Sequence, residues 1–326
     1  MRCKVIALLS LLTLSAGLSC AEVQPLPAEG NVIGEYQEVL AREGDTLILL
    51  ARRFGLGFEE IENANPTVNP FKLKAGSVIR LPLRRILPDA PREGIVVNLP
   101  EHRLYYFPKA KAGETPLVIS YPVSVGKMDW STPIGLTKIQ SKVKDPNWYP
   151  PESVRLEHAA KGDPLPKVVK AGPDNPLGQF AMRLAIPGGA YMIHGTNNPD
   201  GVGMDVTHGC MRLYPENIAA LFKLVSVDTP VRLINEPIKV GVSDGYLWVE
   251  VHPALLMTSG AIVRPSVLDL NRLMLRRAQA QDLGQIIWDK GEQAFSEASG
   301  IAVVVSAANV THSVSSIGTT GMANTP

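Results

Sequence analysis

The feature that most constrains the fold of this chain is a series of short apolar segments between residues 95 and 252. Runs such as "IVVN", "LYYF", "LVISYPVSV" and "YMIH" are rich in β-branched and aromatic residues, which favour strands. Glycine and proline divide these runs, as is typical of turns between strands. Residues 215–227 instead have helical periodicity, with Pro215 near the start. The pattern predicts a mostly β domain with one clear helix.

A shorter segment, residues 36–83, has a different pattern. A first short strand is expected at residues 36–40, and Thr46 follows as the N-cap of a helix. A second helix is expected at residues 58–64, and the apolar alternation of residues 78–82 predicts a closing strand. The segment therefore predicts a compact unit with the order strand, helix, helix, strand.

The turn residues of this segment resemble those of the LysM module, a small α+β glycan-binding domain. The resemblance rests on Gly44-Asp45-Thr46-Leu47, Ala51-x-x-Phe54-Gly55, Ala64-Asn65-Pro66 and Leu73-x-x-Gly76-x-x-Ile79-x-Leu81-Pro82. It implies affinity for N-acetylated sugar polymers such as peptidoglycan, and no chemistry. The alternative is a small αβ cap that only packs on the next domain.

The N-terminus has the pattern of a secretory signal peptide. Basic residues precede an apolar stretch, residues 5–18, that is too short to span a bilayer comfortably and so argues against an uncleaved anchor. A small-x-small site allows cleavage after Ala21, which predicts a signal peptide at residues 1–21 and a periplasmic protein. The less favoured alternative is a lipoprotein anchored through Cys20.

Cleavage after Ala21 would leave Cys210 as the only cysteine of the mature chain, in an oxidising compartment. A lone cysteine is most often a small buried apolar residue. Here, however, the stretch "HGTNNPDGVGMDVTHGC" offers His194 as a partner, since the polar loop between the two can fold back. An imidazole can withdraw the thiol proton and stabilise the ion pair. Gly209 permits a tight bend that leaves backbone N–H groups for an oxyanion.

These residues resemble the L,D-transpeptidase catalytic family, known as the YkuD-type domain. The family signature is a histidine, a loop, then Ser/Thr-His-Gly-Cys, an apolar residue and Asn or Arg. The matching residues here are His194, Thr207-His208-Gly209-Cys210, Met211 and Arg212. The segments "WSTPIG" (130–135) and "GPDNPLG" (172–178) also look like the periplasmic, lipoprotein-attaching branch of the family. The resemblance covers about residues 95–252 and implies a mostly β, sandwich-like catalytic domain.

The resemblance implies a role for each matching residue. Cys210 is the nucleophile, and His194 is its general base and acid. The carbonyl oxygen of Gly195 orients the imidazole ring, and the backbone at Gly209 and Cys210 forms the oxyanion hole.

Two further residues of the motif have supporting roles in the resemblance. His208 supports the site through hydrogen bonds or direct acid–base work, and Arg212 holds the loop or contacts a substrate carboxylate. His194, His208 and Cys210 could also compose a zinc site. The tight His-Gly-Cys spacing and the lack of a further nearby ligand argue against it, so we expect neither a metal nor a cofactor.

The implied reaction is peptide-bond exchange in peptidoglycan by acyl transfer. The donor is a tetrapeptide stem that loses D-alanine, and the acceptor is the amine of another stem, giving a 3→3 cross-link, or a lysine of an outer-membrane lipoprotein. Carbapenem-like β-lactams are expected to acylate Cys210. Two alternatives remain open: an L,D-carboxypeptidase that uses water as the acceptor, and a non-catalytic murein-binding protein.

The remaining sequence completes the expected organisation. The formal charge of +1 gives no indication of a nucleic-acid partner, and nothing indicates an oligomeric state. Residues 22–35 are expected to be a linker, and the long polar segment 144–178 a lid or substrate rim. Surface helices are expected after residue 252. The expected units are a signal peptide (1–21), a LysM-like module (36–83), a catalytic domain (95–235), C-terminal strands and helices (236–300) and a disordered tail (301–326).

Overall fold

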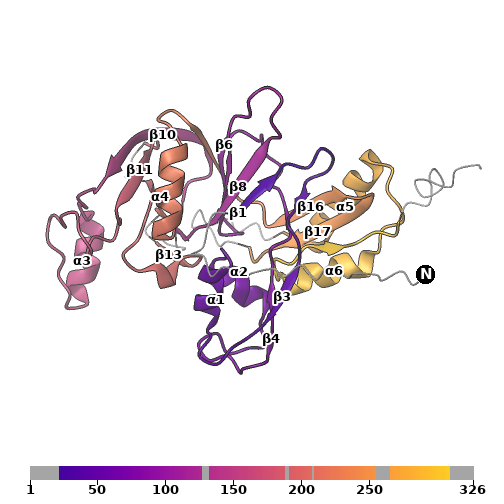
Figure 1. Ribbon diagram of the computed structural model, residues 1–326, viewed down its shortest axis with the longest axis horizontal. Coiled ribbons are helices and arrows are strands. Elements are labelled where there is room, and N and C mark those ends of the chain that lie inside the picture. The colour runs from indigo at the N-terminus through magenta and orange to yellow at the C-terminus, as the bar shows by residue number, and fades with distance from the viewer. Residues whose placement is uncertain (1–21, 127–131, 188–190, 208, 255–264, 309–326) are drawn as a thin grey trace, which may run out of the picture.

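The computed structural model describes residues 22–126, 132–187, 191–207, 209–254 and 265–308. The expected signal peptide, with Cys20, lies outside the described residues, as do Trp130 and His208. Figure 1 shows a large β structure, a small helix-and-strand unit beside it and a C-terminal part with two helices. Within the described residues, no helix is long and apolar enough to cross a membrane.

Nine strands of the described chain form one curled sheet. In order across it they are β1 (Glu22–Pro25), β8 (Leu117–Pro122), β7 (Arg103–Phe107), β6 (Gly94–Asn98), β15 (Pro230–Ile234), β10 (Gly135–Lys144), β11 (Phe180–Leu184), β12 (Met192–His194) and β14 (Met211–Arg212). Neighbouring strands are antiparallel except for two parallel pairs, β6 with β15 and β12 with β14. The mostly β fold class that the sequence predicted is therefore confirmed.

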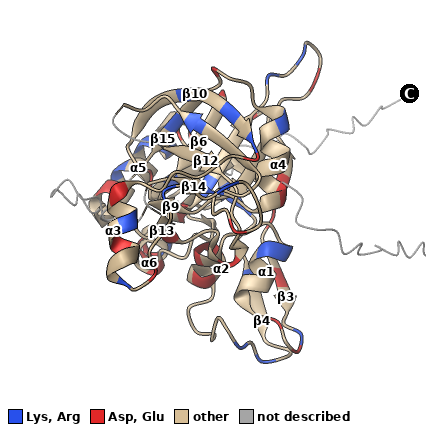
Figure 2. Ribbon diagram, turned by 90° about the vertical axis from the view of Figure 1, so that its left-hand side faces the viewer, with Lys and Arg blue, Asp and Glu red and all other residues tan. Residues whose placement is uncertain are grey.

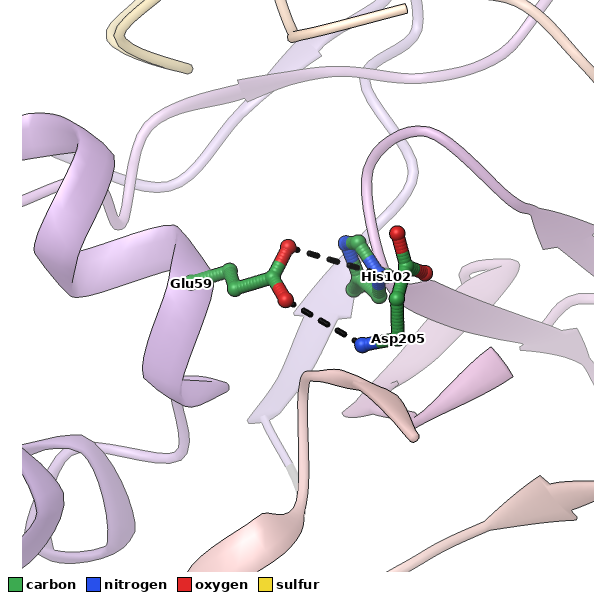
Figure 3. Close-up of side chains that lie close together, drawn as sticks. All are labelled: Glu59, His102 and Asp205. Atoms are coloured by element: carbon green, nitrogen blue, oxygen red, sulfur yellow. Dashed lines mark hydrogen bonds and ion pairs between the residues drawn. The ribbon is translucent and has the colours of Figure 1, made fainter. Parts of the chain in front are cut away.

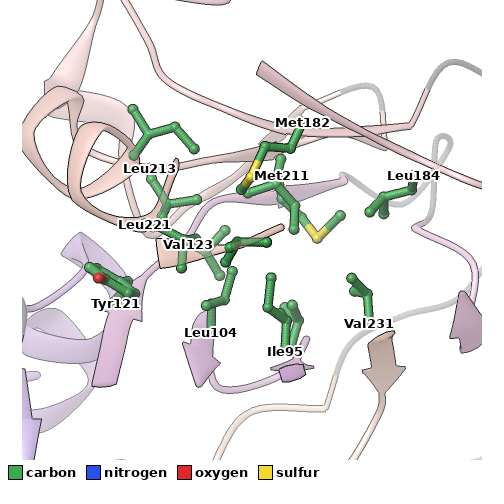
Figure 4. Packing of buried hydrophobic residues seen from close by; sticks show 14 of the residues in the cluster. Ile95, Leu104, Tyr121, Val123, Met182, Leu184, Met211, Leu213, Leu221 and Val231 are labelled. Atoms are coloured by element: carbon green, nitrogen blue, oxygen red, sulfur yellow. The ribbon is translucent and has the colours of Figure 1, made fainter. Parts of the chain in front are cut away.

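The core of this sheet packs against helix α4 (Pro215–Leu224) (Figure 4). Pro215 occupies the first turn of the helix, where its missing N–H costs nothing. Met211 is fully buried in the same cluster as Leu213 and Leu221. The strand that follows Cys210 is thus anchored by apolar packing, which fixes the position of the cysteine backbone.

The expected strand–helix–helix–strand unit is present. It consists of β3 (Gln37–Leu40), α1 (Leu47–Arg53), α2 (Phe58–Ala64) and β4 (Val78–Leu81), with β3 and β4 antiparallel. Thr46 caps α1, since its hydroxyl accepts a hydrogen bond of 3.2 Å from the Leu49 backbone N–H. Leu47, Leu50 and Ile61 are buried in a core of its own. We call residues 36–83 the LysM-like module.

The C-terminal part has its own core of strands and helices. Strands β16 (Ile238–Ser243) and β17 (Tyr246–Val251) form a hairpin whose turn residues, Asp244 and Gly245, have positive φ angles. Helices α5 (Val267–Ala280) and α6 (Trp288–Glu297) pack on it, as expected. A short strand, β18 (Val303–Val304), pairs with β17. Residues 301–308, expected to begin a disordered tail, are thus ordered by a partner distant in sequence.

Two other expectations about connecting segments were wrong. Residues 22–35 are not a plain linker, because β1 pairs with β8, and β2 (Val32–Ile33) pairs with β5 (Arg85–Ile86). The segment 144–178 contains a helix, α3 (Glu152–Ala160), so α4 is not the only helix of the catalytic region. Strands of two to four residues carry almost no local signal, since their hydrogen bonds come from residues far away in sequence.

Candidate active site

Strands β12 and β14 bring the two ends of the cysteine motif together. They are parallel, with Ile193 opposite Met211 and His194 opposite Arg212. Ile193 and Met211 are buried in the core of the sheet. Because side chains alternate along a strand, their neighbours His194, Cys210 and Arg212 point to the other face. We call residues 195–209, which connect the two strands, the connecting loop.

His194, Cys210 and Arg212 line one cavity of about 880 Å³. Part of the wall comes from the segment expected to be a lid or rim, and its lining residues include Asn147, Trp148, Tyr149, Pro151, Val154 and Leu177. The wall is largely apolar and aromatic, whereas the floor carries the ionisable groups. This combination is typical of a substrate site in which a few polar groups do the chemistry.

His194 is oriented by the main chain that follows it. Its Nδ1 lies 2.7 Å from the carbonyl oxygen of Gly195, which can only accept a hydrogen bond. The proton therefore resides on Nδ1, and Nε2 is left as the basic atom. Burial, together with the positive charge of Arg212, lowers the pKa of His194 to about 3. The imidazole is therefore neutral at neutral pH, although a pKa this low also makes it a weak base in the resting site.

Cys210 is held as a thiol in the resting site. Burial raises its pKa above the ordinary value, although a backbone contact with Met192 and the charge of Arg212 act in the opposite direction. The sequence suggested a thiolate–imidazolium ion pair, but the two pKa shifts favour a neutral thiol beside a neutral imidazole. His194 is buried, whereas Cys210 is only partly buried and lines the cavity. The nearby charge, that of Arg212, is a cation that opposes protonation of His194.

Arg212 has unused hydrogen-bonding capacity. Its Nε is buried and has no hydrogen-bond partner among the described residues. Burial lowers the pKa of the guanidinium, which nevertheless stays charged at neutral pH. A buried charged donor without an acceptor is costly, so the cavity favours a ligand that brings a carboxylate to it.

Two threonines hold the turn that contains Cys210. Thr132 is 2% exposed, and its hydroxyl donates a hydrogen bond of 3.1 Å to the carbonyl oxygen of Gly209. The hydroxyl of Thr207 donates to the carbonyl oxygen of Cys210 at 2.5 Å. A peptide group is planar, so fixing the Gly209 carbonyl also fixes the direction of the Cys210 N–H. Gly209 has φ of 91°, a conformation that favours glycine at this turn.

Sequence reasoning missed Thr132, although it belongs to the quoted segment "WSTPIG". Nothing local indicates that this segment reaches a residue 77 positions away. His208, which the sequence assigned a supporting role, lies outside the described residues. The alternative zinc site, which needs His208, therefore falls outside them as well. The structure brings His194, Gly195, Gly209, Cys210 and Arg212 together at one end of the sheet.

Carboxylates and histidines also gather away from this cavity. Within the described residues, two groups have the spacing of a metal site: Glu59 with His102 and Asp205, and Glu101 with Glu250 and His252. In the second group the Lys239 ammonium lies 2.8 Å from Glu101 and 2.7 Å from Glu250. This buried cation already supplies the positive charge that a metal would bring. Neither group lines the cavity of Cys210.

Comparison with known proteins adds two family matches and several relatives. The model of the L,D-transpeptidase catalytic domain (YkuD) matches residues 92–233, and that of the LysM domain matches residues 41–82. The probable L,D-transpeptidase YbiS of Escherichia coli is 38% identical over 290 residues, 87% of this chain and 92% of the relative. YcfS of E. coli, also a probable L,D-transpeptidase, is 43% identical over 240 residues, 72% of this chain and 74% of the relative. The probable L,D-transpeptidase ErfK/SrfK of Salmonella typhimurium is 41% identical over 242 residues, 73% of this chain and 76% of the relative.

Proposed function

Because this chain belongs to the YkuD family of L,D-transpeptidases, we propose that Cys210 and His194 are its nucleophile and its general base. The observation that carries the assignment is the parallel pairing of β12 with β14. It places both side chains on the same face of the sheet and in the same cavity. The substrate class is peptidoglycan, which both the catalytic domain and the LysM domain imply.

In the first half-reaction, Cys210 Sγ attacks the carbonyl carbon of the third residue of a tetrapeptide stem. As the C–S bond forms, the thiol proton moves to His194 Nε2. The oxyanion is stabilised by the N–H of Cys210, whose direction Thr132 fixes through the Gly209 carbonyl. When the C–N bond breaks, His194 returns the proton to the departing amine of D-alanine, and a thioester remains.

In the second half-reaction, an acceptor amine attacks the thioester. His194 removes a proton from the amine as the new C–N bond forms, and the C–S bond breaks. The proton then returns to the sulfur, which restores the neutral thiol that the raised pKa of Cys210 favours. The neutral resting imidazole suits both steps, because it can accept a proton each time.

Arg212 is proposed to bind a carboxylate of the stem peptide. Arg212 lines the cavity, and its guanidinium has a buried Nε with no hydrogen-bond partner among the described residues. The LysM-like module is proposed to hold the glycan strand, and the protein to act in the periplasm. The acceptor is proposed to be either a second stem, giving a 3→3 cross-link, or a lysine of an outer-membrane lipoprotein.

The test is a reaction of the full chain with a purified tetrapeptide stem, followed by mass spectrometry. Wild type is expected to release D-alanine and form cross-linked dimers, and Cys210→Ala to do neither. A carbapenem is expected to add its mass to wild type but not to Cys210→Ala. Equal labelling of the two would refute the assignment of the nucleophile.

The same experiment separates the two alternatives. Release of D-alanine with water as the only acceptor would indicate a carboxypeptidase. Binding to purified sacculi without any release of D-alanine would indicate a non-catalytic murein-binding protein. Adding a peptide with the lysine of the lipoprotein as a competing amine tests the second proposed acceptor.

A further inference from the structure

The LysM-like module contacts the connecting loop directly, through the N-terminus of α2. The backbone N–H of Phe58 donates to the carbonyl of Val202 at 3.0 Å, and that of Glu59 donates to the carbonyl of Gly203 at 3.1 Å. These are N–H groups of the first helical turn, which have no partner within the helix. Carbonyl groups of the catalytic domain thus accept the hydrogen bonds that these N–H groups cannot make within α2.

The side chain of Glu59 extends this contact into a charged network (Figure 3). One carboxylate oxygen accepts a hydrogen bond of 3.1 Å from the backbone N–H of Asp205, and the other lies 3.7 Å from Nε2 of His102. The same Nε2 lies 2.9 Å from the Asp205 carboxylate. Asp205 begins β13 (Asp205–Thr207), the strand that leads to the turn of Cys210.

The carboxylates of this network favour the protonated form of His102. It is buried in the turn between β6 and β7, and burial alone would lower its pKa. The carboxylates of Asp205, Glu59 and Glu60 outweigh that effect and raise the pKa of His102. The His102 ring of the catalytic domain therefore lies between a carboxylate of the module and a carboxylate of the connecting loop.

Further contacts hold the module in a fixed position against the catalytic domain. Arg52 of α1 forms a two-point ion pair with Glu216 at the start of α4, with both distances 3.0 Å. The hydroxyl of Tyr214 donates to the Leu56 carbonyl at 3.1 Å. Arg103, fully buried in β7, donates to both carboxylate oxygens of Glu60, at 2.8 and 3.0 Å. A glycan-binding unit on a flexible tether would need none of these contacts.

We propose that Glu59 is a positioning residue for the L,D-transpeptidase reaction. By holding Asp205 it fixes the connecting loop, the two ends of which carry His194 and Cys210. The LysM-like module is then part of the active-site scaffold as well as a glycan-binding unit. The inference rests on the proposed function only for the identity of the nucleophile and the base.

A glycan-free substrate separates the two roles of the module. If the module only binds glycan, changes in α2 leave the reaction of a soluble tetrapeptide, or of a carbapenem, unaffected. If the module also positions the loop, the same changes slow both reactions. The rate of Cys210 acylation by a carbapenem, followed by intact mass, reports on the loop without any contribution from glycan.

The variants are Glu59→Ala, Glu59→Gln and the matched control Glu62→Ala, all in the full chain. Glu62 lies on the same helix, three residues further on, and its charge repels that of Glu59. Among the described residues, however, its side chain makes no hydrogen bond or ion pair with Asp205 or His102. Glu59→Ala is expected to slow acylation about tenfold, because small displacements of reacting groups are costly. The KM for tetrapeptide should stay near that of wild type while kcat falls. Glu59→Gln keeps an oxygen that can accept from the Asp205 N–H, so its loss should be intermediate, and Glu62→Ala should match wild type.

Several results would overturn the inference. One is acylation of folded Glu59→Ala at the wild-type rate, and another is an equal loss in Glu62→Ala. A loss seen with sacculi but absent with the soluble tetrapeptide would assign Glu59 to glycan binding instead. Thermal unfolding shows whether each variant is folded, and Glu59→Gln carries the test if Glu59→Ala is not. If wild type itself were not acylated, the proposed function would fail and this inference with it.

Discussion

Two histidines on opposite sides of the connecting loop show how differently one fold can treat the same side chain. His194 is 3% exposed and His102 is 5% exposed, so water is nearly absent from both. The pKa of His194 is lowered by burial and then by Arg212, whereas the pKa of His102 is raised by its carboxylate neighbours. Burial disfavours the charged form in both cases, and the sign of the nearest charges decides the outcome.

The difference extends to the surroundings of each histidine. On the active-site side the contacts are neutral hydrogen bonds, from the His194 ring to Gly195 and from Thr132 to Gly209. On the module side the contacts are between charged groups, Glu59 and Asp205 with His102. A general base has to be unprotonated at neutral pH, whereas a residue that only holds a loop can use its charge fully. The loop therefore lies between the region where we propose that proton transfer occurs and the region where the LysM-like module is attached.

The largest expected effect comes from removing the base. His194→Gln keeps a similar polar shape but cannot accept a proton, so kcat should fall by about 10²–10⁴, the usual contribution of general acid–base catalysis. His102→Gln should lose far less activity, since His102 touches no reacting atom. The measurement is D-alanine release from tetrapeptide, with thermal unfolding as the control for folding. Equal losses of activity in His194→Gln and His102→Gln would contradict the proposed difference between the two histidines.

A smaller effect is expected from removing the hydrogen bond between the Thr132 hydroxyl and the Gly209 carbonyl, which holds the turn of the proposed oxyanion hole. Thr132→Val should lower kcat about tenfold, less than the 10²–10³ that removal of an oxyanion donor itself costs. Thr132→Ser keeps the hydroxyl and should recover most of the rate.

Thr137→Val is the matched control for this substitution. The Thr137 hydroxyl is buried and has no hydrogen-bond partner among the described residues, so its loss should leave kcat unchanged. If Thr132→Val had the wild-type rate, the turn would not depend on the hydrogen bond to Gly209.

The smallest effect is a difference in titration, measured by NMR of the imidazole protons. His194, with a pKa of about 3, should stay neutral between pH 5 and 8. His102 should remain charged at pH 6.5, its ordinary pKa, and titrate above it. His194→Gln and His102→Gln assign the two signals. Two coincident titrations near pH 6.5 would contradict the comparison.

These pKa shifts have opposite consequences for stability. The native state binds fewer protons at His194 than the unfolded state between about pH 3 and 6.5, so this residue lowers stability as the pH falls through that window. At His102 the native state binds more protons above pH 6.5, so its ion pairs stabilise fully below that pH. That stabilisation is lost as the pH rises through the raised pKa of His102.

Much of the fold and the candidate residues could be predicted from the sequence, because their signals are local. Thr46 as an N-cap and the bounds of α2 follow from side chains within a few residues. The pairing of His194 with Cys210 was expected from the motif and the loop between them. The attachment of Asp205 to Glu59 was not, because 146 positions separate the two and neither has a local role. The neutral thiol was not predicted either, since it depends on the burial of Cys210, which the local motif does not show.

The close approach of two glycines limits which LysM domains could replace the one in this protein. Where α2 meets the connecting loop, a Cβ on Gly203 would lie 2.3 Å from the Cα of Gly57, and a Cβ on Gly57 would lie 2.8 Å from the Cα of Gly203. A LysM unit from another protein could therefore be grafted here only if it also had glycine before its second helix. Exchanging one of the two domains therefore requires that the other fit it at this contact.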